Sequence, residues 1–305
     1  MTDETVSLSV PSFSSLDQSL TDIAGQLSAS SQRIYAHDAR HFATWIQTLG
    51  LTPAIMTRSD MIAYRQYLAT SSYAKNTKQR MFSVACRLMN EQYLTGTLKE
   101  KVTQDIKGFH VGSDETTHAA LDKRQAREML DSITVETAQG KRDYAILLLL
   151  AKTGLRRAEL CDLNRDDITM RDGHHVAIIR HGKGDKVRVV KLRVDVHRAL
   201  VEYLSAIPMA SRDAPLFVSF RKGDHPTERR ITDKGIENLV KKYAPDGVEL
   251  SPHGMRATFA TLALESGAQL HQVQYAMGHK DPRTTERYQK RKLNLDDNAV
   301  DVLNF

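Results

Sequence analysis

The stretch from residue 251 to residue 290 reads "SPHGMRATFATLALESGAQLHQVQYAMGHKDPRTTERYQK". Its apolar spacing predicts helices over about 253–265 and 269–277, followed by a last helix that carries Tyr288. His253 and Arg256 are three residues apart at the start of the first of these helices, so their side chains share one face. His279 stands nine residues before Tyr288, in a segment crowded with charged side chains. The stretch therefore brings two histidines, an arginine and a phenol together.

The segments before this stretch divide into a helical part and a mixed part. Residues 1–14 are rich in serine and threonine and predict a flexible tail. Three helical patterns follow. The first begins at Ser31, the second would be capped by Ser59, and the third covers about 75–93. Residues 15–107 are therefore predicted to form an all-helical domain. Glycine, serine and threonine without an apolar period predict a linker over 108–118.

Residues 119–305 predict an α+β domain. A buried helix, "DYAILLLLAKTG", is expected to stop at Gly154. The β-rich runs "HVAIIR" and "KVRVVKL" flank "HGKGD" and predict a hairpin, and "PLFVSF" over 215–220 predicts another short strand. A helix is expected over 233–243, and an apolar set closes the chain over 293–305. The fold class is therefore mainly α with a small β-sheet.

Composition limits the class of protein. The chain has 305 residues, which suits two domains, and it is 41% hydrophobic and 26% charged. The longest apolar run, "AILLLLA", is far shorter than the roughly 20 residues of a membrane span, and the start of the chain lacks the features of a secretory signal. Two isolated cysteines favour a reduced, cytoplasmic setting. A net charge of +6 favours a polyanionic partner without proving one.

Further basic side chains stand in two other segments. Arg156 follows Gly154 in "TGLRRAEL", and Lys183 lies at the tip of the predicted hairpin. Two arginines, two histidines, a lysine and a phenol suit a scissile phosphodiester: planar guanidinium groups bind phosphate oxygens and stabilise the charge of the transition state. A lysine can protonate a leaving oxygen, and a phenol with a pKa of about 10 needs basic or cationic neighbours to act as a nucleophile.

Each of these side chains taken alone has a commoner structural explanation. Arg156 or its neighbour Arg157 could be a surface ion-pair partner, and a lysine in a glycine turn is usually solvated. No histidine or cysteine spacing typical of a metal site occurs. Only the combined order and spacing of these residues favours phosphate chemistry.

Two segments carry a resemblance to the tyrosine recombinase family, also called the phage integrase family, which includes Xer-type and Cre-type enzymes. "TGLRRAELCDL" resembles the first arginine box of the family, and the stretch over 251–290 resembles its second box almost end to end. The likeness covers about residues 120–295, and the helical first domain is similar to the core-binding domain of the family. The resemblance implies a two-domain, site-specific recombinase that cleaves and rejoins DNA through a 3′-phosphotyrosine intermediate.

The resemblance also implies how the scissile phosphate is bound. Arg156 and Arg256 would clamp it, and His279 would donate a hydrogen bond to one of its oxygens. His253 would assist proton transfer, and Glu159 would support the site from behind.

The reacting groups follow from the same resemblance. Tyr288 would attack the phosphorus, which leaves a 3′-phosphotyrosine link and a free 5′-hydroxyl. Lys183 would act as the general acid toward that leaving group, with Lys186, three residues further on, as the alternative.

Partners and cofactors are likewise implied. The expected partner is double-stranded DNA at an inverted-repeat site, bound by a homotetramer that pairs two sites. The segment 293–305 is expected to dock either on a neighbouring protomer or on its own domain. No metal and no ATP are expected, and accessory proteins are left open as further partners. Lys75, Lys78 and Arg80 would suit a helix lying against a phosphate backbone, although a solvated helix start is the commoner explanation of each residue taken singly.

Two other functions are compatible with these residues. A type IB topoisomerase-like enzyme would share the phenol attack but relax supercoils without pairing sites. A catalytically silent, sequence-specific DNA-binding protein could use the same fold. Filled positions for all six catalytic side chains favour an active recombinase.

Overall fold

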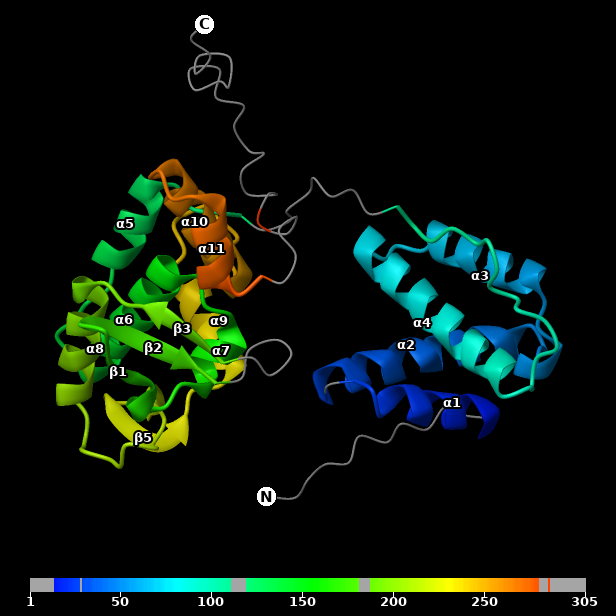
Figure 1. Cartoon of the computed structure of the whole chain (residues 1–305), viewed down its shortest axis with the longest axis horizontal. Helices are drawn as coiled ribbons and strands as arrows, with labels where there is room; N and C mark the ends of the chain where they lie inside the picture. The colour runs from blue at the N-terminus through cyan, green and yellow to red at the C-terminus, as the bar shows by residue number, and fades with distance from the viewer. Residues whose placement is uncertain (1–13, 28, 111–118, 181–186, 280–284, 286–305) are drawn as a thin grey trace, which may run out of the picture. The chain divides into compact units, whose positions relative to one another are not determined.

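The computed structural model describes residues 14–27, 29–110, 119–180, 187–279 and 285, and the chain divides into two compact units, 1–112 and 113–305. The described part of the first unit is helical, whereas the second unit combines helices with two small antiparallel sheets (Figure 1). The structure thus confirms the predicted fold class, mainly α with a small β component.

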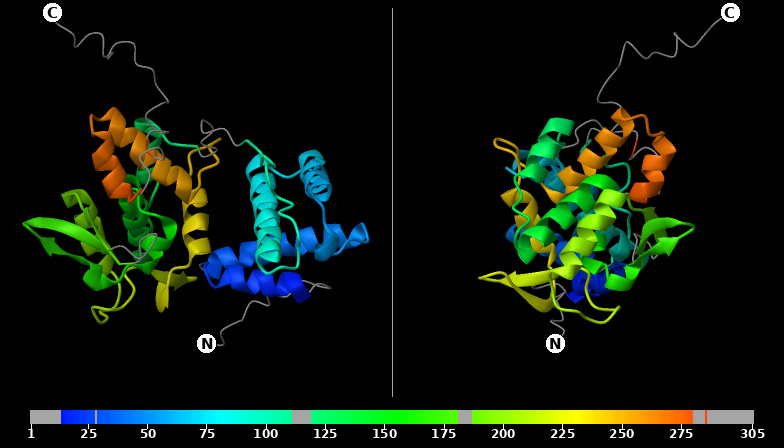
Figure 2. Two further views of the ribbon diagram at one scale, coloured as in Figure 1. Left: turned by 45° about the vertical axis from the view of Figure 1, so that its right-hand side comes forward. Right: turned by 90° about the vertical axis from the view of Figure 1, so that its left-hand side faces the viewer.

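The first unit is built on long helices around one apolar core. Its elements are α1 (Ser14–Ala24), α2 (Ala29–Thr48), the 3₁₀ helix η1 (Pro53–Ile55), α3 (Arg58–Thr70) and α4 (Lys75–Leu94). α4 packs against α1, α2 and α3 (Figure 2). The sequence analysis missed α1, although Leu16, Leu20 and Ile23 recur at helical spacing and all three are fully buried.

The start of α3 lies two residues earlier than predicted. Thr57, not Ser59, is the N-cap: its hydroxyl accepts from the Asp60 amide at 3.3 Å. The Asp60 carboxylate accepts from the Thr57 amide at 2.8 Å in return. This reciprocal pair satisfies amide donors that have no partner within the helix, and Ser59 lacks a carboxylate three residues later.

The second unit surrounds a central apolar helix. Its elements are α5 (Lys123–Asp131), α6 (Ala138–Thr153), α7 (Arg157–Asp162), η2 (Arg165–Asp167), β1 (Ile168–Arg171), β2 (His174–Ile179), β3 (Arg188–Lys191), α8 (Val194–Ser205), β4 (Val218–Arg221), β5 (His225–Arg230), α9 (Asp233–Lys242), α10 (Pro252–Glu265) and α11 (Leu270–Met277). α6 is buried over most of its length, and α8 and α10 pack against it. α10 and α11 lie at one end of the unit, and the β4–β5 hairpin lies at the other (Figures 1 and 2).

The predicted hairpin is present as β2 and β3, which pair antiparallel with Ile179 opposite Arg188. β1 adds a third strand on the other side of β2, and the expected strand near 215–220 is β4, paired with β5. The sequence analysis missed β1, which is only four residues long, and β5, which consists of polar residues and a proline without apolar alternation.

Local signals fix both ends of α6. The Thr137 hydroxyl accepts from the Gly140 amide at 3.0 Å at the start, and Gly154 ends the helix with a left-handed φ of 62°. The helix ends at the residue that the sequence predicted. No helix in the described part of the chain is long and apolar enough to cross a membrane.

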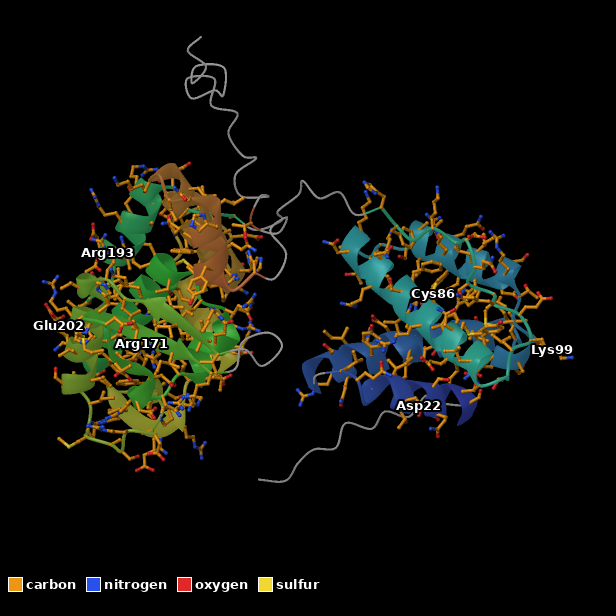
Figure 3. All side chains as sticks on the ribbon, in the orientation of Figure 1. Asp22, Cys86, Lys99, Arg171, Arg193 and Glu202 are labelled. Carbon is orange, nitrogen blue, oxygen red and sulfur yellow. The ribbon has the colours of Figure 1, made fainter. Side chains whose placement is uncertain are left out.

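Charged side chains cover the outside of both units. In the second unit Arg171 lies at the end of β1, and Glu202 projects from α8 (Figure 3). In the first unit Lys99 lies in the loop after α4 (Figure 3). Among the described residues, surface charge alone therefore does not mark a functional site.

We expect Leu88→Ala to lower the free energy of unfolding of the first unit by about 2–5 kcal/mol, because Leu88 is fully buried in α4 and its truncation leaves a cavity. Urea unfolding followed by fluorescence of Trp45, the only tryptophan, would measure this. Leu94→Ala in the same helix is the matched control, because Leu94 is 73% exposed and its loss should cost less than about 0.5 kcal/mol. Equal effects of the two changes would contradict the described core.

Candidate active site

The first part of the candidate site lies where α6 ends and α7 begins. Arg156 is the N-cap residue of α7, and Glu159 lies at the third position of that helix. The Arg156 amide donates to Glu159 Oε2 at 2.8 Å, and Arg156 Nη1 donates to Glu159 Oε1 at 2.7 Å. Glu159 thus caps the helix start and holds the arginine side chain at the same time.

Arg157 takes a different path. Its guanidinium lies 3.3 Å from an Asp233 carboxylate oxygen and 3.7 Å from one of Glu237, both on α9. The sequence could not separate the two neighbouring arginines. In the structure Arg157 joins α7 to α9, whereas Arg156 points to Glu159 and to the Gly278 carbonyl, which accepts from its Nη2 at 3.1 Å.

Glu159 is the centre of a buried charge cluster. Besides the bonds from Arg156, its two oxygens accept from Arg188 Nη1 at 2.8 Å and Nη2 at 2.7 Å. Burial alone would raise the pKa of Glu159, but hydrogen bonds from Arg188 and Arg156 and the charge of Arg188 outweigh it and lower that pKa to about 2. The carboxylate therefore stays ionised at every pH at which the protein is expected to work.

Arg256 enters the site from the opposite side. It lies on α10. Ser251 caps the start of this helix, because its hydroxyl accepts from the Gly254 amide at 3.0 Å. The Arg256 side chain is buried and donates to the Gly154 carbonyl, at the end of α6, and to the Met277 carbonyl at 2.5 Å, at the end of α11. One arginine thus joins three helices.

His279 follows the glycine that ends α11. Gly278 has a left-handed φ of 62°, and the His279 amide donates to the Gln274 carbonyl at 3.1 Å. Burial lowers the pKa of His279, and the charges of Arg256, Arg156, His253 and Arg188 lower it further, to about 3. The ring is therefore neutral at pH 7. Its Nδ1 lies 2.8 Å from Thr285 Oγ1, and if Nδ1 accepts that hydroxyl proton, Nε2 carries the ring hydrogen and can donate.

Three of the predicted site residues border one cleft. A cavity of about 490 Å³ is lined by Arg156, His253 and Arg256 together with Arg157, Ala158, Asp233, Glu237, Lys241, Ser251 and Pro252. His253 is exposed and lies one turn before Arg256 on α10. The guanidinium groups of Arg156 and Arg256 and the imidazole of His253 at one cleft suit an anion with several oxygens, such as a phosphodiester.

Three predicted site residues lie outside the described residues: Lys183 and Lys186 in the turn between β2 and β3, and Tyr288 near the end of the chain. Their proposed roles stay predictions. Among the described residues, no three histidine, cysteine, aspartate or glutamate side chains are grouped so that they could hold a metal ion.

The predicted DNA-contacting residues lie on α4 in the first unit, and two of them have structural partners. Lys78 Nζ donates to the Ala69 carbonyl at 2.8 Å, near the end of α3. Arg80 binds the fully buried Asp38 with Nε at 2.8 Å and Nη2 at 3.1 Å. Lys75, the first residue of α4, is exposed. Contact with DNA stays a prediction for all three.

The sequence analysis missed Arg188 as a member of the site. It lies in the run that predicted β3, and an arginine among valines in a half-buried strand is the signal that could have identified it. Its partner Glu159 is 29 positions away in the chain, so spacing alone did not connect the two.

Comparisons with known proteins identify the family of this chain. The model of the phage integrase family matches residues 119–294. Tyrosine recombinase XerD of Proteus mirabilis is 30% identical over 273 residues, which cover 86% of this chain and 83% of that protein. Tyrosine recombinase XerC of Pelobacter propionicus is 30% identical over 267 residues, which cover 86% of this chain and 85% of that protein. The chain therefore belongs to the phage integrase family of tyrosine recombinases.

Solved structures support the same fold. The Tn1549 transposon integrase, in complex with circular intermediate DNA, has a TM-score of 0.66 at 17% identity, with 96% of this chain and 100% of that chain covered. A lambda integrase dimer bound to a COC′ core site has a TM-score of 0.69 at 14% identity, with 94% and 98% covered. These likenesses concern the fold, because the sequences are so distant.

The depressed pKa of Glu159 predicts a pH-dependent contribution to stability. The contribution is present above the usual pKa near 4.5 and is lost as the pH falls toward 2. We expect Glu159→Gln to lower the free energy of unfolding at pH 7 by on the order of 3 kcal/mol, and the gap to the wild type to close between pH 4.5 and 2.

Urea unfolding followed by far-UV circular dichroism, with Trp45 fluorescence recorded in parallel to assign the transition of the first unit, would test this. Glu128→Gln is the matched control, because Glu128 pairs with Arg124 on the surface and its side chain is 51% exposed. A gap between Glu159→Gln and the wild type that stayed constant down to pH 2 would contradict the charged, paired state of Glu159.

Proposed function

We propose that this chain is a site-specific DNA recombinase that cuts and rejoins DNA strands through a covalent 3′-phosphotyrosine intermediate. The observation that carries the proposal is the convergence of three distant segments on one short turn. Arg256 donates to the Met277 carbonyl, Arg156 donates to the Gly278 carbonyl, and His279 follows directly. Membership of the tyrosine recombinase family gives this arrangement its chemistry.

The cleavage step uses Tyr288 as nucleophile. Its oxygen attacks the phosphorus, the bond from phosphorus to the 5′ oxygen breaks, and the 3′ end of the cut strand stays joined to the tyrosine. His253 assists removal of the phenol proton, and Lys183 gives a proton to the 5′ oxygen as it leaves. A 5′-hydroxyl then attacks the phosphotyrosine and restores a phosphodiester. The bond energy is kept in the covalent link, so the reaction needs no ATP.

The arginines and His279 bind the phosphate. Arg156 and Arg256 bring planar, permanently charged donors to its oxygens, where they stabilise the charge of the five-coordinate transition state. The low pKa of His279 keeps its ring neutral, so it acts as a hydrogen-bond donor from Nε2 rather than as an acid. These groups also do the work that metal ions do in many phosphoryl transfers, and the proposal includes no metal cofactor.

The proposal extends to the partner and the assembly. Double-stranded DNA is the substrate, with residues 15–107 as the core-binding domain, 108–118 as linker and 119–305 as the catalytic domain. XerH has been solved bound to its difH substrate, and lambda integrase as a dimer on its core site. By analogy, four protomers would pair two inverted-repeat sites in the cytoplasm, with residues 293–305 docked on a neighbouring protomer.

Covalent trapping tests the proposed nucleophile. Protein would be mixed with fragmented genomic DNA of the source organism in EDTA and quenched in SDS, and DNA that stays attached would be sequenced. We expect the wild type to capture one inverted-repeat site and Tyr288→Phe to capture none, because the phenol oxygen forms the link. Tyr275→Phe is the matched control, since Tyr275 is an exposed tyrosine on α11 and should leave capture unchanged.

The other outcomes identify the competing functions. Reads scattered over the genome would indicate topoisomerase-like activity. A protein that binds DNA specifically but never becomes attached, even to a nicked substrate that traps the intermediate, would be a silent DNA-binding protein, and the proposal would fail.

A sulfur-substituted substrate tests the general acid. We expect Lys183→Ala to slow cleavage of the trapped site by at least about 100-fold. Replacing the bridging 5′ oxygen by sulfur should restore most of that rate, because a thiolate leaves without a proton. Lys186→Ala is the matched control and should cleave both substrates at nearly the wild-type rate. The reverse pattern would assign the role to Lys186.

A further inference from the structure

Arg188 is a buried arginine that the proposed chemistry does not use. It is the first residue of β3, directly after the turn that carries Lys183, and its side chain is 10% exposed. Both terminal nitrogens bind Glu159, one to each oxygen, at 2.8 and 2.7 Å. This two-bond geometry is specific to arginine, because a lysine offers a single charged nitrogen and cannot span both oxygens in the same way.

The carboxylate that Arg188 holds is the one that holds Arg156. Glu159 Oε1 accepts from Arg156 Nη1 at 2.7 Å, and Oε2 accepts from the Arg156 amide at 2.8 Å. With two bonds from each arginine, the hydrogen-bonding capacity of the carboxylate is filled. Glu159 therefore cannot turn without breaking bonds to Arg188, and the Arg156 guanidinium is fixed through it.

Arg188 also lies against the turn before His279. A Cβ built at Gly278 would stand 3.0 Å from the guanidinium carbon of Arg188, so only glycine fits beside this arginine without a shift. Arg156 Nη2 donates to the carbonyl of the same glycine at 3.1 Å. Arg188 thus packs on one side of the Gly278 turn while Arg156 bonds to it.

The contact between Arg188 and Glu159 is poorly explained by stability alone. A buried ion pair contributes little net stability compared with apolar residues of similar volume. Moreover, Arg188 Nε is buried without a hydrogen-bond partner among the described residues. The two hydrogen bonds from Arg188 do fix the orientation of the Glu159 carboxylate, which an apolar side chain could not do.

We infer that Arg188 is a positioning residue: through Glu159 and the Gly278 turn it holds Arg156 and His279 in the geometry that binds the scissile phosphate. The inference rests on the proposed recombinase function. It gives the β2–β3 hairpin a second role besides carrying the general acid, because the strand after the turn fixes the phosphate clamp.

Arg188→Lys tests this role, because it keeps the positive charge but cannot make both hydrogen bonds to Glu159. The substrate is a duplex with the site recovered by covalent trapping, nicked a few nucleotides 3′ of the scissile phosphate so that the released fragment diffuses away. We expect the single-turnover rate of covalent complex formation at saturating protein to fall about 10- to 100-fold, because a small misplacement of a binding group has effects of that size. DNA affinity, measured in a Tyr288→Phe background, and the urea midpoint should stay near the parental values.

Arg180→Lys is the matched control. Arg180 lies at the other foot of the same hairpin and pairs with Asp167 at 2.5 Å and Asp166 at 3.1 Å, neither of which contacts the site arginines in the described residues. Its rate should stay within about 2-fold of the wild type, because the change keeps the charge and the guanidinium of Arg180 is half-exposed and away from the candidate site.

A double-mutant comparison shows whether Arg188 acts through Arg156. We expect Arg156→Lys with Arg188→Lys to be no slower than Arg156→Lys alone, because the second change removes support for a group already altered. Multiplied effects of the two changes would overturn the inference. Restoration of the Arg188→Lys rate by a 5′-sulfur substrate would also overturn it, since Arg188 would then act by placing the lysine of the hairpin.

Two results separate failure of the inference from failure of the proposed function. If the wild type forms no covalent complex with the nicked duplex, the recombinase function fails and the inference fails with it. If the wild type reacts and Arg188→Lys reacts equally fast, only the inference fails. Arg188→Gln serves as a second variant. If both variants lose rate only in proportion to stability or DNA affinity, Arg188 is merely structural and the inference is wrong.

Discussion

The buried carboxylate of Glu159 is the constraint on which the rest of the site depends. An ionised carboxylate inside a protein is very unfavourable unless its hydrogen-bonding capacity is filled. Here two arginines from different elements fill it, Arg156 at the start of α7 and Arg188 on β3. Since neither arginine can leave without stranding the charge, the helix start and the hairpin are fixed to each other. The same hydrogen bonds and charges lower the pKa of Glu159, because they stabilise its ionised form.

Helix ends complete the placement of the cationic groups. The last carbonyls of a helix lack partners within it and carry partial negative charge. Arg256 binds the carbonyls of Gly154 and Met277, and Arg156 binds the carbonyl of Gly278, so the C-terminal ends of α6 and α11 hold both guanidinium groups. Left-handed glycines at these two ends turn the chain sharply enough for the carbonyls to face the site. The partial negative charges also offset the repulsion between arginines that lie close together.

Features of the fold and of the candidate site were predictable from the sequence where neighbouring residues determine them, and were missed where distant residues do. The hairpin of β2 and β3 and the end of α6 at Gly154 follow from apolar spacing and turn residues, and both were predicted. α1 was missed because its three serines and one threonine obscured the helical recurrence of Leu16, Leu20 and Ile23. β5 was missed because a polar strand is defined by its pairing with β4, which no local pattern records. The link between Arg188 and Glu159 escaped for the same reason, since a contact across the fold leaves no spacing to recognise.

The described residues of the candidate site offer groups that can bind and orient an anion, whereas bond making is proposed for residues outside the described part of the chain. Thr285 is fully buried, and its hydroxyl lies 2.8 Å from His279 Nδ1. Tyr288 follows three residues later, and an extended chain of that length spans at most about 11 Å between Cα atoms. The contact between Thr285 and His279 thus ties the segment after α11 to the turn whose carbonyls both guanidinium groups bind.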